Sequence, residues 1–328
     1  MDVKREVEDL GDGLYAWVQG DGSWGWSNAG LVTSQGETLL IDTLFTGALT
    51  RDMLDGFRRA APEAAKIDTL VNTHANGDHT FGNHLVEGAR IIASAEAARE
   101  MAERTPEEAA AAFAAWREQG EMGAFLHEVM GSKFDFSDVR YAPPTETFSG
   151  RRDLTVGDLT VELHELGPAH TAGDVIAWLP ERRTAFTGDL VFHGGAPILW
   201  AGPIGNWIQA CELMLSWSPE TIVPGHGAVG DATMLHEMLE YLTYVRDEAT
   251  ARHHAGLPWQ EAAWDISMDG FPHLSDRERI VCNVAQVYRE LSGGRIAPER
   301  AEIVGLMGRW HWGWETPHEK TCACGHPH

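Results

Sequence analysis

The sequence predicts an α/β fold, because runs of strand length alternate with helical patterns along most of the chain. The expected strands are residues 13–19, 26–33, 38–42, 68–72, 90–93, 152–156, 159–166, 174–179, 184–187 and 221–223. Helical patterns at 47–60 and 206–217 follow strand runs, and we therefore expect helices on the outer faces of a sheet. With 43% hydrophobic residues, the chain can bury a full core.

Two further segments are helical by composition. Residues 95–135 are rich in alanine and start a helix with Thr105-Pro106-Glu107-Glu108. From residue 231 the pattern is almost all helix, and Ser275 with Glu278 is expected to form a capping box. We therefore predict an α/β domain at 1–230 with a helical insertion at about 95–135, and a C-terminal helical extension at 231–328 packed on it. The insertion is expected near the site mouth as a lid, or else as an oligomer surface or second-layer helix.

The composition restricts the classes of partner. A formal charge of -24 argues against nucleic acids and anionic membranes, which require basic surface, and leaves a small-molecule substrate. The chain has no run of about 20 apolar residues, so we expect no membrane span. The charged start of the chain lacks the apolar stretch of a signal peptide, and we predict a cytoplasmic protein. Homo- and hetero-oligomeric assembly both stay open.

The four cysteines predict no structural zinc site. Cys211 and Cys282 lie in helical patterns and are expected as buried free thiols. The tail carries metal-binding residue types, but without the C-x₂-C spacing of a zinc site, and we expect a frayed terminus there. These tail residues are Cys322, Cys324, His326 and His328.

A group of histidines and aspartates follows the expected strands at four separate places. The turn Thr73–His79 follows an apolar run, and three later turns place a histidine or aspartate beside glycine at the end of another run. The candidate ligands are His74, Asp78, His79, His170, Asp189 and His226. Imidazole and carboxylate suit Zn²⁺ and other divalent transition metals, so these turns predict a metal site at one sheet edge.

These turns, in this order, resemble the metallo-β-lactamase superfamily over about residues 8–230. The resemblance implies a four-layer αββα sandwich that holds one or two Zn²⁺ ions. It implies that the first metal is held by His74, His170 and Asp189, and the second by Asp78, His79 and His226, with Asp189 between them. Asn76 stands where the family usually has the second His of HxHxDH. An amide is a weak ligand for such metals, so iron or manganese is an alternative.

The chemistry expected of such a site is hydrolysis by metal-activated water. A metal with an open position lowers the pKa of bound water to about 7. Asp78 is expected to bind metal and to orient the nucleophile. We also expect the amide of Asn76 to donate a hydrogen bond to a developing oxyanion.

Tryptophan is abundant, with 13 residues, which favours a flat or apolar substrate if several line the pocket. The expected substrate-binding residues, all near ligand turns, are Trp24, Trp26, His193, Trp200 and Trp207. Within the superfamily, the segment 24–30, the turn Pro168-Ala169-His170 and the helix 283–294 resemble aromatic polyketide cyclases or thioesterases and hydrolases of aromatic esters and ethers.

Three functions follow from these observations. The first is a metal-dependent hydrolase acting on a small aromatic or apolar ester, thioester or activated aryl ether. The second is a polyketide cyclase or thioesterase of the same fold, in which the cyclisation itself consumes no water. The third is a non-catalytic or partner-dependent subunit with a degenerate metal site. Incorporation of ¹⁸O from water distinguishes the first from the second.

Overall fold

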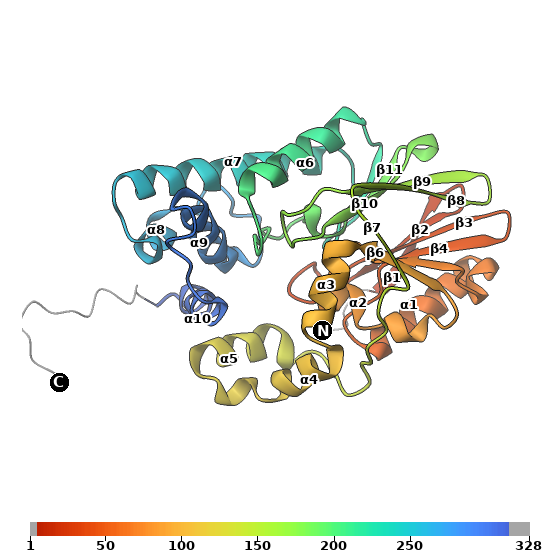
Figure 1. Cartoon of the computed structure of the whole chain (residues 1–328), viewed down its shortest axis with the longest axis horizontal. Coiled ribbons are helices and arrows are strands. Elements are labelled where there is room, and N and C mark those ends of the chain that lie inside the picture. The colour runs from red at the N-terminus through yellow and green to blue at the C-terminus, as the bar shows by residue number, and fades with distance from the viewer. Residues whose placement is uncertain (1–4, 315–328) are drawn as a thin grey trace, which may run out of the picture.

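Two β-sheets packed face to face form the centre of the protein, with helices on both outer faces (Figure 1). The computed structural model describes residues 5–314. The first sheet consists, in spatial order, of β1 (Arg5–Gly11), β2 (Leu14–Gln19), β3 (Ala29–Ser34), β4 (Glu37–Ile41), β5 (Thr69–Val71), β6 (Arg90–Ser94) and β7 (Glu146–Phe148). Its first four strands are antiparallel, and β4 to β7 run parallel. The edge strands β1 and β7 were not among the expected strands.

The second sheet has five strands. They are β12 (Thr221–Val223), β11 (Thr184–Phe186), β10 (Val175–Leu179), β9 (Leu159–Glu165) and β8 (Arg151–Val156), in that spatial order. The pair β11 and β12 is parallel, and the other neighbours are antiparallel.

Three layers of apolar contact hold the sheets and helices together. Between the sheets, Val32 and Ile41 of the first pack with Leu163 of the second, all fully buried. Helix α1 (Gly47–Ala60) covers the outer face of the first sheet, and α6 (Ile204–Ser216) with α7 (Thr233–His254) covers that of the second. The predicted four-layer αββα sandwich is therefore confirmed. No helix within residues 5–314 combines the length and hydropathy that a membrane crossing requires.

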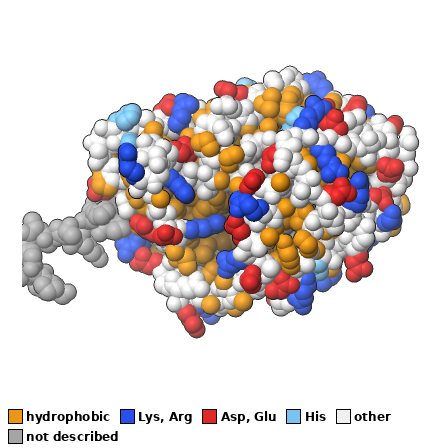
Figure 2. Space-filling view, viewed as in Figure 1, with side chains coloured by type: hydrophobic (Ala, Val, Ile, Leu, Met, Phe, Trp, Pro, Cys, Tyr) orange, Lys and Arg blue, Asp and Glu red, His pale blue; other side chains and the backbone are white. Residues whose placement is uncertain are grey.

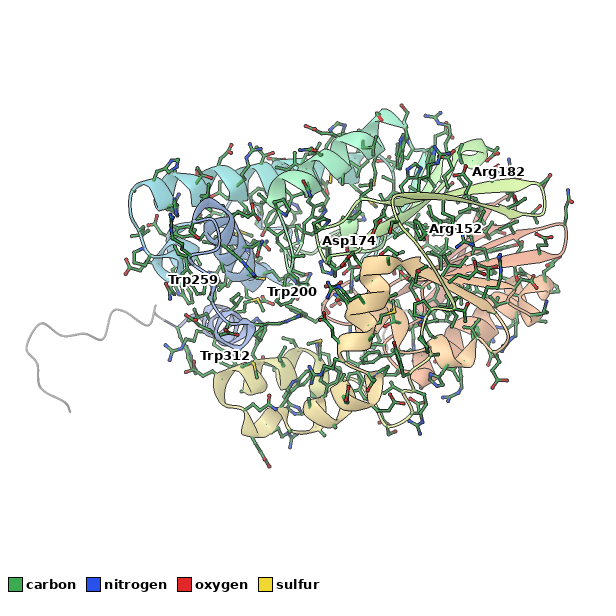
Figure 3. All side chains as sticks on the ribbon, in the orientation of Figure 1. Arg152, Asp174, Arg182, Trp200, Trp259 and Trp312 are labelled. Atoms are coloured by element: carbon green, nitrogen blue, oxygen red, sulfur yellow. The ribbon has the colours of Figure 1, made fainter. Side chains whose placement is uncertain are left out.

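The helical insertion and the C-terminal helices meet on one side of the sandwich. These helices are α2 (Gly77–Thr80), α3 (Ala95–Glu103), α4 (Pro106–Ala114), α5 (Gly120–Leu126), α8 (Trp259–Asp265), α9 (Ile280–Leu291) and α10 (Arg300–His311). Helix α10 packs on α5, and Trp312 lies at the end of α10 nearest the C-terminus (Figures 1 and 3). The insertion and the extension therefore close over the same side of the sandwich, although residues 136–230 separate them in the sequence.

The two expected helix starts have different outcomes. Thr105 caps α4 in a complete capping box with Glu108. The capping box predicted at Ser275 is wrong, because the side chain of Glu278 turns away from the helix start and accepts a hydrogen bond from Trp24 Nε1 at 2.8 Å. Cys211 and Cys282 are buried free thiols, as expected. The predictions for Cys322, Cys324, His326 and His328 lie outside the described residues.

A chain of polar contacts ties α10 to the insertion and to the segment that carries Trp24. His311 lies 3.5 Å from Glu278 through Nδ1 and 3.5 Å from Glu128 through Nε2. Trp312 Nε1 donates to Glu128 at 2.9 Å. The hydrogen bond to Glu278 and its charge raise the pKa of His311, although partial burial opposes them.

This contact predicts a pH-dependent contribution to stability. Because the folded-state pKa of His311 is raised above the ordinary value of about 6.5, its stabilising effect is full below that value and is lost as pH rises through the folded pKa. His311→Gln should therefore lower the unfolding temperature more at pH 6 than at pH 9. With a third of the side chain exposed, we expect less than about 1 kcal/mol. Thermal unfolding at both pH values measures this difference. His236→Gln, on the exposed face of α7, is the control. An equal loss of unfolding temperature at both pH values in His311→Gln would contradict the pairing.

Candidate active site

The structure brings the six predicted ligands together at one edge of the two sheets. The ligand turns follow β5, β9, β11 and β12, so each side chain starts from a fixed strand end. Two clusters result, each with its ligand atoms within 4.8 Å of one another. The first cluster is His74, His170 and Asp189, and the second cluster is Asp78, His79 and His226.

Asp189 connects the two clusters. Its Oδ2 lies 3.4 Å from His170 Nε2 and 3.8 Å from His74 Nε2. The same carboxylate approaches the second cluster, with 3.1 Å from Oδ1 to His79 Nε2 and 3.4 Å from Oδ2 to His226 Nε2. Gly225 allows this arrangement, since a Cβ there would come within 2.0 Å of Asp189 Oδ1.

Outer hydrogen bonds orient the imidazoles of His74 and His79. Asp42 accepts hydrogen bonds from the Thr73 backbone N–H at 2.7 Å and from Thr73 Oγ1 at 2.6 Å. Because the hydroxyl of Thr73 donates to Asp42, it accepts from His74 Nδ1, 3.0 Å away. His79 Nδ1 lies 2.9 Å from Asp42 Oδ2 and donates to it. Both rings therefore turn Nε2 toward the clusters, as in metal sites whose ligands are held by outer partners.

His170 is oriented from two sides. Its Nδ1 donates to the carbonyl of Ile198 at 2.7 Å, which leaves a lone pair on Nε2. The Asn76 amide lies 2.9 Å from that Nε2 through Nδ2 and donates to the lone pair. A cation in the first cluster would compete with Asn76 for the same lone pair. The structure thus places Asn76 at the site, next to a predicted ligand.

Buried carboxylates and imidazoles shift one another's pKa. Burial lowers the pKa of His170 to about 4, although Asp189 opposes the shift. Burial also acts to lower the pKa of His226, but the carboxylates of Asp189 and Asp78 outweigh it and raise the value to about 9. For Asp78, His79 and His226 outweigh burial and lower the pKa to about 2. At neutral pH His170 is therefore neutral and Asp78 ionised, as metal binding requires, and His226 carries a proton that a cation would displace.

The donor set fits a divalent transition metal. Three buried ligand atoms have no hydrogen-bond partner among the described residues: His74 Nε2, His79 Nε2 and Asp189 Oδ1. Leaving buried polar atoms unpaired is costly, so their convergence on one place indicates a bound cation. Imidazole nitrogen with carboxylate oxygen is the ligand combination of catalytic zinc sites.

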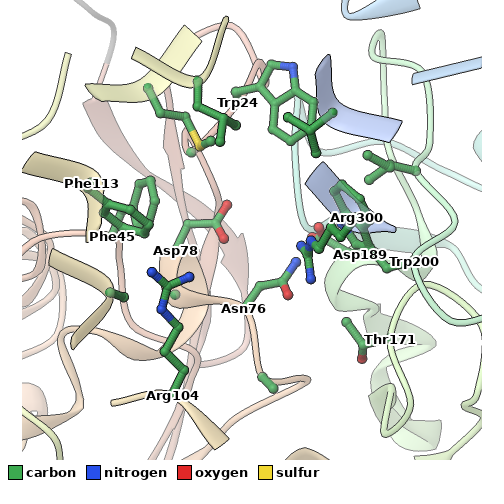
Figure 4. A pocket seen from close by; sticks show the side chains of 18 of the residues that line it. Trp24, Phe45, Asn76, Asp78, Arg104, Phe113, Thr171, Asp189, Trp200 and Arg300 are labelled. Atoms are coloured by element: carbon green, nitrogen blue, oxygen red, sulfur yellow. The ribbon is translucent and has the colours of Figure 1, made fainter. Parts of the chain in front are cut away.

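A cavity of about 710 Å³ opens above the clusters. Figure 2 shows a hollow on this face, walled by hydrophobic side chains and with basic side chains at its rim. Asn76, Asp78 and Asp189 lie in the cavity lining, with Phe45 and Phe113 on one side and Trp200 on the other (Figure 4). The cavity can therefore hold an organic molecule of moderate size with a reactive bond next to the ligand clusters.

Two of the five predicted substrate-binding residues lie in the cavity lining, namely Trp24 and Trp200. The other three are not among the residues that line this cavity. Trp26 packs on Phe134 with ring centroids 4.6 Å apart. Trp207 is fully buried and donates from Nε1 to the carbonyl of Leu190 at 2.9 Å. His193 turns to the carbonyl of Ala228, 2.9 Å from its Nδ1.

Three arginines in the cavity wall were missed by the sequence analysis, namely Arg104, Arg279 and Arg300. Isolated arginines in helical segments carry no motif, and the chain has a large negative charge. The helix start at Thr105, which follows Arg104 directly, was the nearest available signal.

Fold and site together define a metallo-hydrolase architecture, and comparisons with known proteins agree. The family model described as the Metallo-beta-lactamase superfamily matches residues 22–226. A metallo-beta-lactamase type 2 from Pseudomonas aeruginosa is 22% identical over 245 residues, which cover 72% of this chain and 83% of that protein. A metallo-beta-lactamase type 2 from Bacillus cereus is 28% identical over 107 residues, which cover 31% of this chain and 42% of that protein.

Solved structures share the fold. A metallo-beta-lactamase from Pontibacter korlensis matches with a TM-score of 0.57 and 21% identity, over 73% of this chain and 99% of that one. A stereoselective inverting sec-alkylsulfatase from Pseudomonas sp. matches with a TM-score of 0.66 and 16% identity, over 89% of this chain and 51% of that one. This chain belongs to the metallo-beta-lactamase superfamily and is a metallo-hydrolase.

Proposed function

We propose that this protein is a Zn²⁺-dependent hydrolase that acts on a small aromatic or apolar ester, thioester or activated aryl ether. One observation carries the proposal: two adjoining ligand clusters form the floor of a cavity whose walls carry aromatic and aliphatic side chains beside polar ones. Such walls bind an apolar body by burial, and they place its reactive bond at the polar floor.

The bound ion supplies Lewis acidity and a water of lowered pKa. The residues of the first and second clusters would hold it. Hydrolysis forms a bond from the water oxygen to the attacked carbon and breaks the bond from that carbon to the leaving oxygen or sulfur, which takes up a proton. The carboxylate of Asp78 lines the cavity, 3.3 Å from His226 Nε2, and is placed to accept a hydrogen bond from the attacking water. Phe45, Phe113 and Trp24 exclude bulk solvent from this side of the substrate.

The Asn76 amide is placed at the same floor and has N–H groups to donate. If it stabilises an oxyanion, Asn76→Ala should lower kcat by about 10²–10³-fold while metal content stays unchanged. Asn76→His should instead increase resistance to a chelator, because it adds an imidazole beside the first cluster. Metal analysis together with steady-state kinetics measures both variants. Loss of metal in Asn76→Ala would contradict the oxyanion role.

The test of the proposed function starts with metal analysis of protein purified without added metal. Aryl esters, thioesters and activated aryl ethers are then supplied in H₂¹⁸O, and we expect stoichiometric metal and ¹⁸O in the product. Cyclised product without ¹⁸O would instead indicate a polyketide cyclase of this fold. Protein that lacks metal and turnover alone, and gains turnover with a partner, would indicate a partner-dependent subunit.

A further inference from the structure

Two arginines project into the cavity from helical segments on opposite sides. Arg104 directly follows α3, in the insertion, and Arg300 is the first residue of α10, in the C-terminal extension. Figure 4 shows both guanidinium groups reaching into the pocket toward Asn76. Arg300 lies outside residues 22–226, the part of the chain that the family model matches.

Neither arginine has a hydrogen-bond or ion-pair partner among the described residues. Arg104 lies over the ring of Phe113, 5.8 Å from its centroid, and Arg300 lies 4.0 Å from the centroid of Trp200. These aromatic faces hold the flat guanidinium groups in place but leave their N–H donors free.

The other charged side chains of the cavity wall are already paired. Glu103 forms an ion pair with Arg99, and Glu100 accepts from the backbone N–H of Ala172 at 3.3 Å. Arg279 lies 2.9 Å from Asp276 and donates to the carbonyl of Ala196 at 2.7 Å. Glu100 acts on Arg300 through its charge, but within residues 5–314 no carboxylate forms an ion pair with Arg104 or Arg300.

This arrangement favours the binding of an anion. Desolvation by the surrounding protein lowers the pKa of Arg300 and the positive charge of Arg104 adds to the lowering, although Cys282 and Glu100 oppose it. Its side chain is nevertheless accessible to solvent, because it faces the cavity. Two like charges that act on each other across the same cavity are stabilised by a negatively charged group between them.

We propose that Arg104 and Arg300 bind an anionic oxygen group of the substrate, a carboxylate, sulfate or phosphate, while the aromatic wall binds its ring. Planar guanidinium groups match such groups with paired N–H donors. This inference rests on the proposed function in one respect only, namely that the bound anion belongs to the substrate. It narrows the substrate class to aromatic or apolar compounds that carry an acidic group away from the bond that is cleaved.

A binding experiment tests the inference independently of turnover. Phenylacetate and phenylacetamide differ in charge but little in shape, and calorimetry measures their affinities for zinc-loaded and metal-free protein. We expect phenylacetate to bind at least about tenfold tighter than phenylacetamide, to zinc-loaded and to metal-free protein alike. Arg104→Gln and Arg300→Gln should each remove most of this preference. Arg99→Gln, on α3 but outside the cavity wall, should retain the preference. Binding of the neutral phenylacetamide shows that each variant is folded.

Two results would overturn the inference. One is a double Arg104→Gln and Arg300→Gln variant that still prefers phenylacetate. The other is a preference that disappears when the metal is removed, because the anion would then be held by the metal. Kinetics separates this inference from the proposed function: 4-nitrophenyl hemisuccinate should be preferred over 4-nitrophenyl butyrate in the wild type and lose its advantage in the arginine variants. Hydrolysis of both esters without a charge preference refutes only the arginine site, whereas metal-loaded protein that hydrolyses neither refutes only the proposed function.

Discussion

Asp189→Asn should abolish both metal binding and turnover. The substitution keeps the shape of the side chain but removes the charge that four imidazole Nε2 atoms approach within 3.8 Å. Since this carboxylate connects the two clusters, its neutralisation weakens both at once. We expect turnover to fall by about 10³-fold or more, which corresponds to about 4 kcal/mol of lost transition-state stabilisation. Metal analysis after dialysis and steady-state kinetics on an aryl ester measure the two effects.

The control for this substitution is Asp153→Asn, on β8, whose carboxylate pairs with Arg151 and is 53% exposed. It removes the same charge from the surface and should leave metal content and turnover unchanged. A variant of Asp189 that retains full metal in both clusters would refute the connecting role. Retained turnover with lost metal would refute the metallo-hydrolase mechanism itself.

The ligand turns could be predicted because each comes after the end of a strand. An apolar run fixes where a strand ends, and parallel strand ends such as those of β4, β5 and β6 meet at one edge. The helix start at Thr105 was also predicted correctly, because no residue from a distant part of the described chain bonds to its capping side chains. Glu278 shows the limit of such signals. Its side chain bonds to Trp24, 254 residues away, instead of to the start of the helix. A local sequence pattern cannot show that such a distant partner exists.

The cavity wall could not be predicted for a related reason. Its residues come from the sandwich, the insertion and the extension, and only the packing of α5 on α10 brings them together. Trp200 and Trp207 are both near ligand turns in the sequence, yet one lines the cavity and the other is fully buried. Position along the chain does not determine which way a side chain on such a loop or helix points. The strand β1 was also missed, because its exposed and half-buried residues lack a continuous apolar run.

Asp42→Ala should destabilise the fold and weaken metal binding together. Asp42 is buried and accepts from Thr73 N and Thr73 Oγ1, while pairing with His79 Nδ1 at 2.9 Å. Alanine leaves all three donors unpaired, and loss of one partner from a buried charged network costs about 3–5 kcal/mol. Asp42 also has a positive φ of 62°, which alanine tolerates less well than aspartate or asparagine. Urea unfolding of metal-free protein should therefore rank wild type above Asp42→Asn, and Asp42→Asn above Asp42→Ala.

Asp12→Ala is the matched control for the cost of placing alanine at a positive φ. Asp12 has a similar φ of 52°, but its side chain is 74% exposed. The stability lost by Asp12→Ala measures the left-handed conformation together with one exposed ion pair to Arg182, 3.5 Å away, so the excess loss at position 42 measures the buried polar network. The same network orients His74 and His79, so metal affinity should also fall by about 10–100-fold in Asp42→Ala and stay unchanged in Asp12→Ala. Equal destabilisation by the two variants would show that Asp42 contributes only through its left-handed backbone conformation. The imidazoles of His74 and His79 would then be oriented by packing.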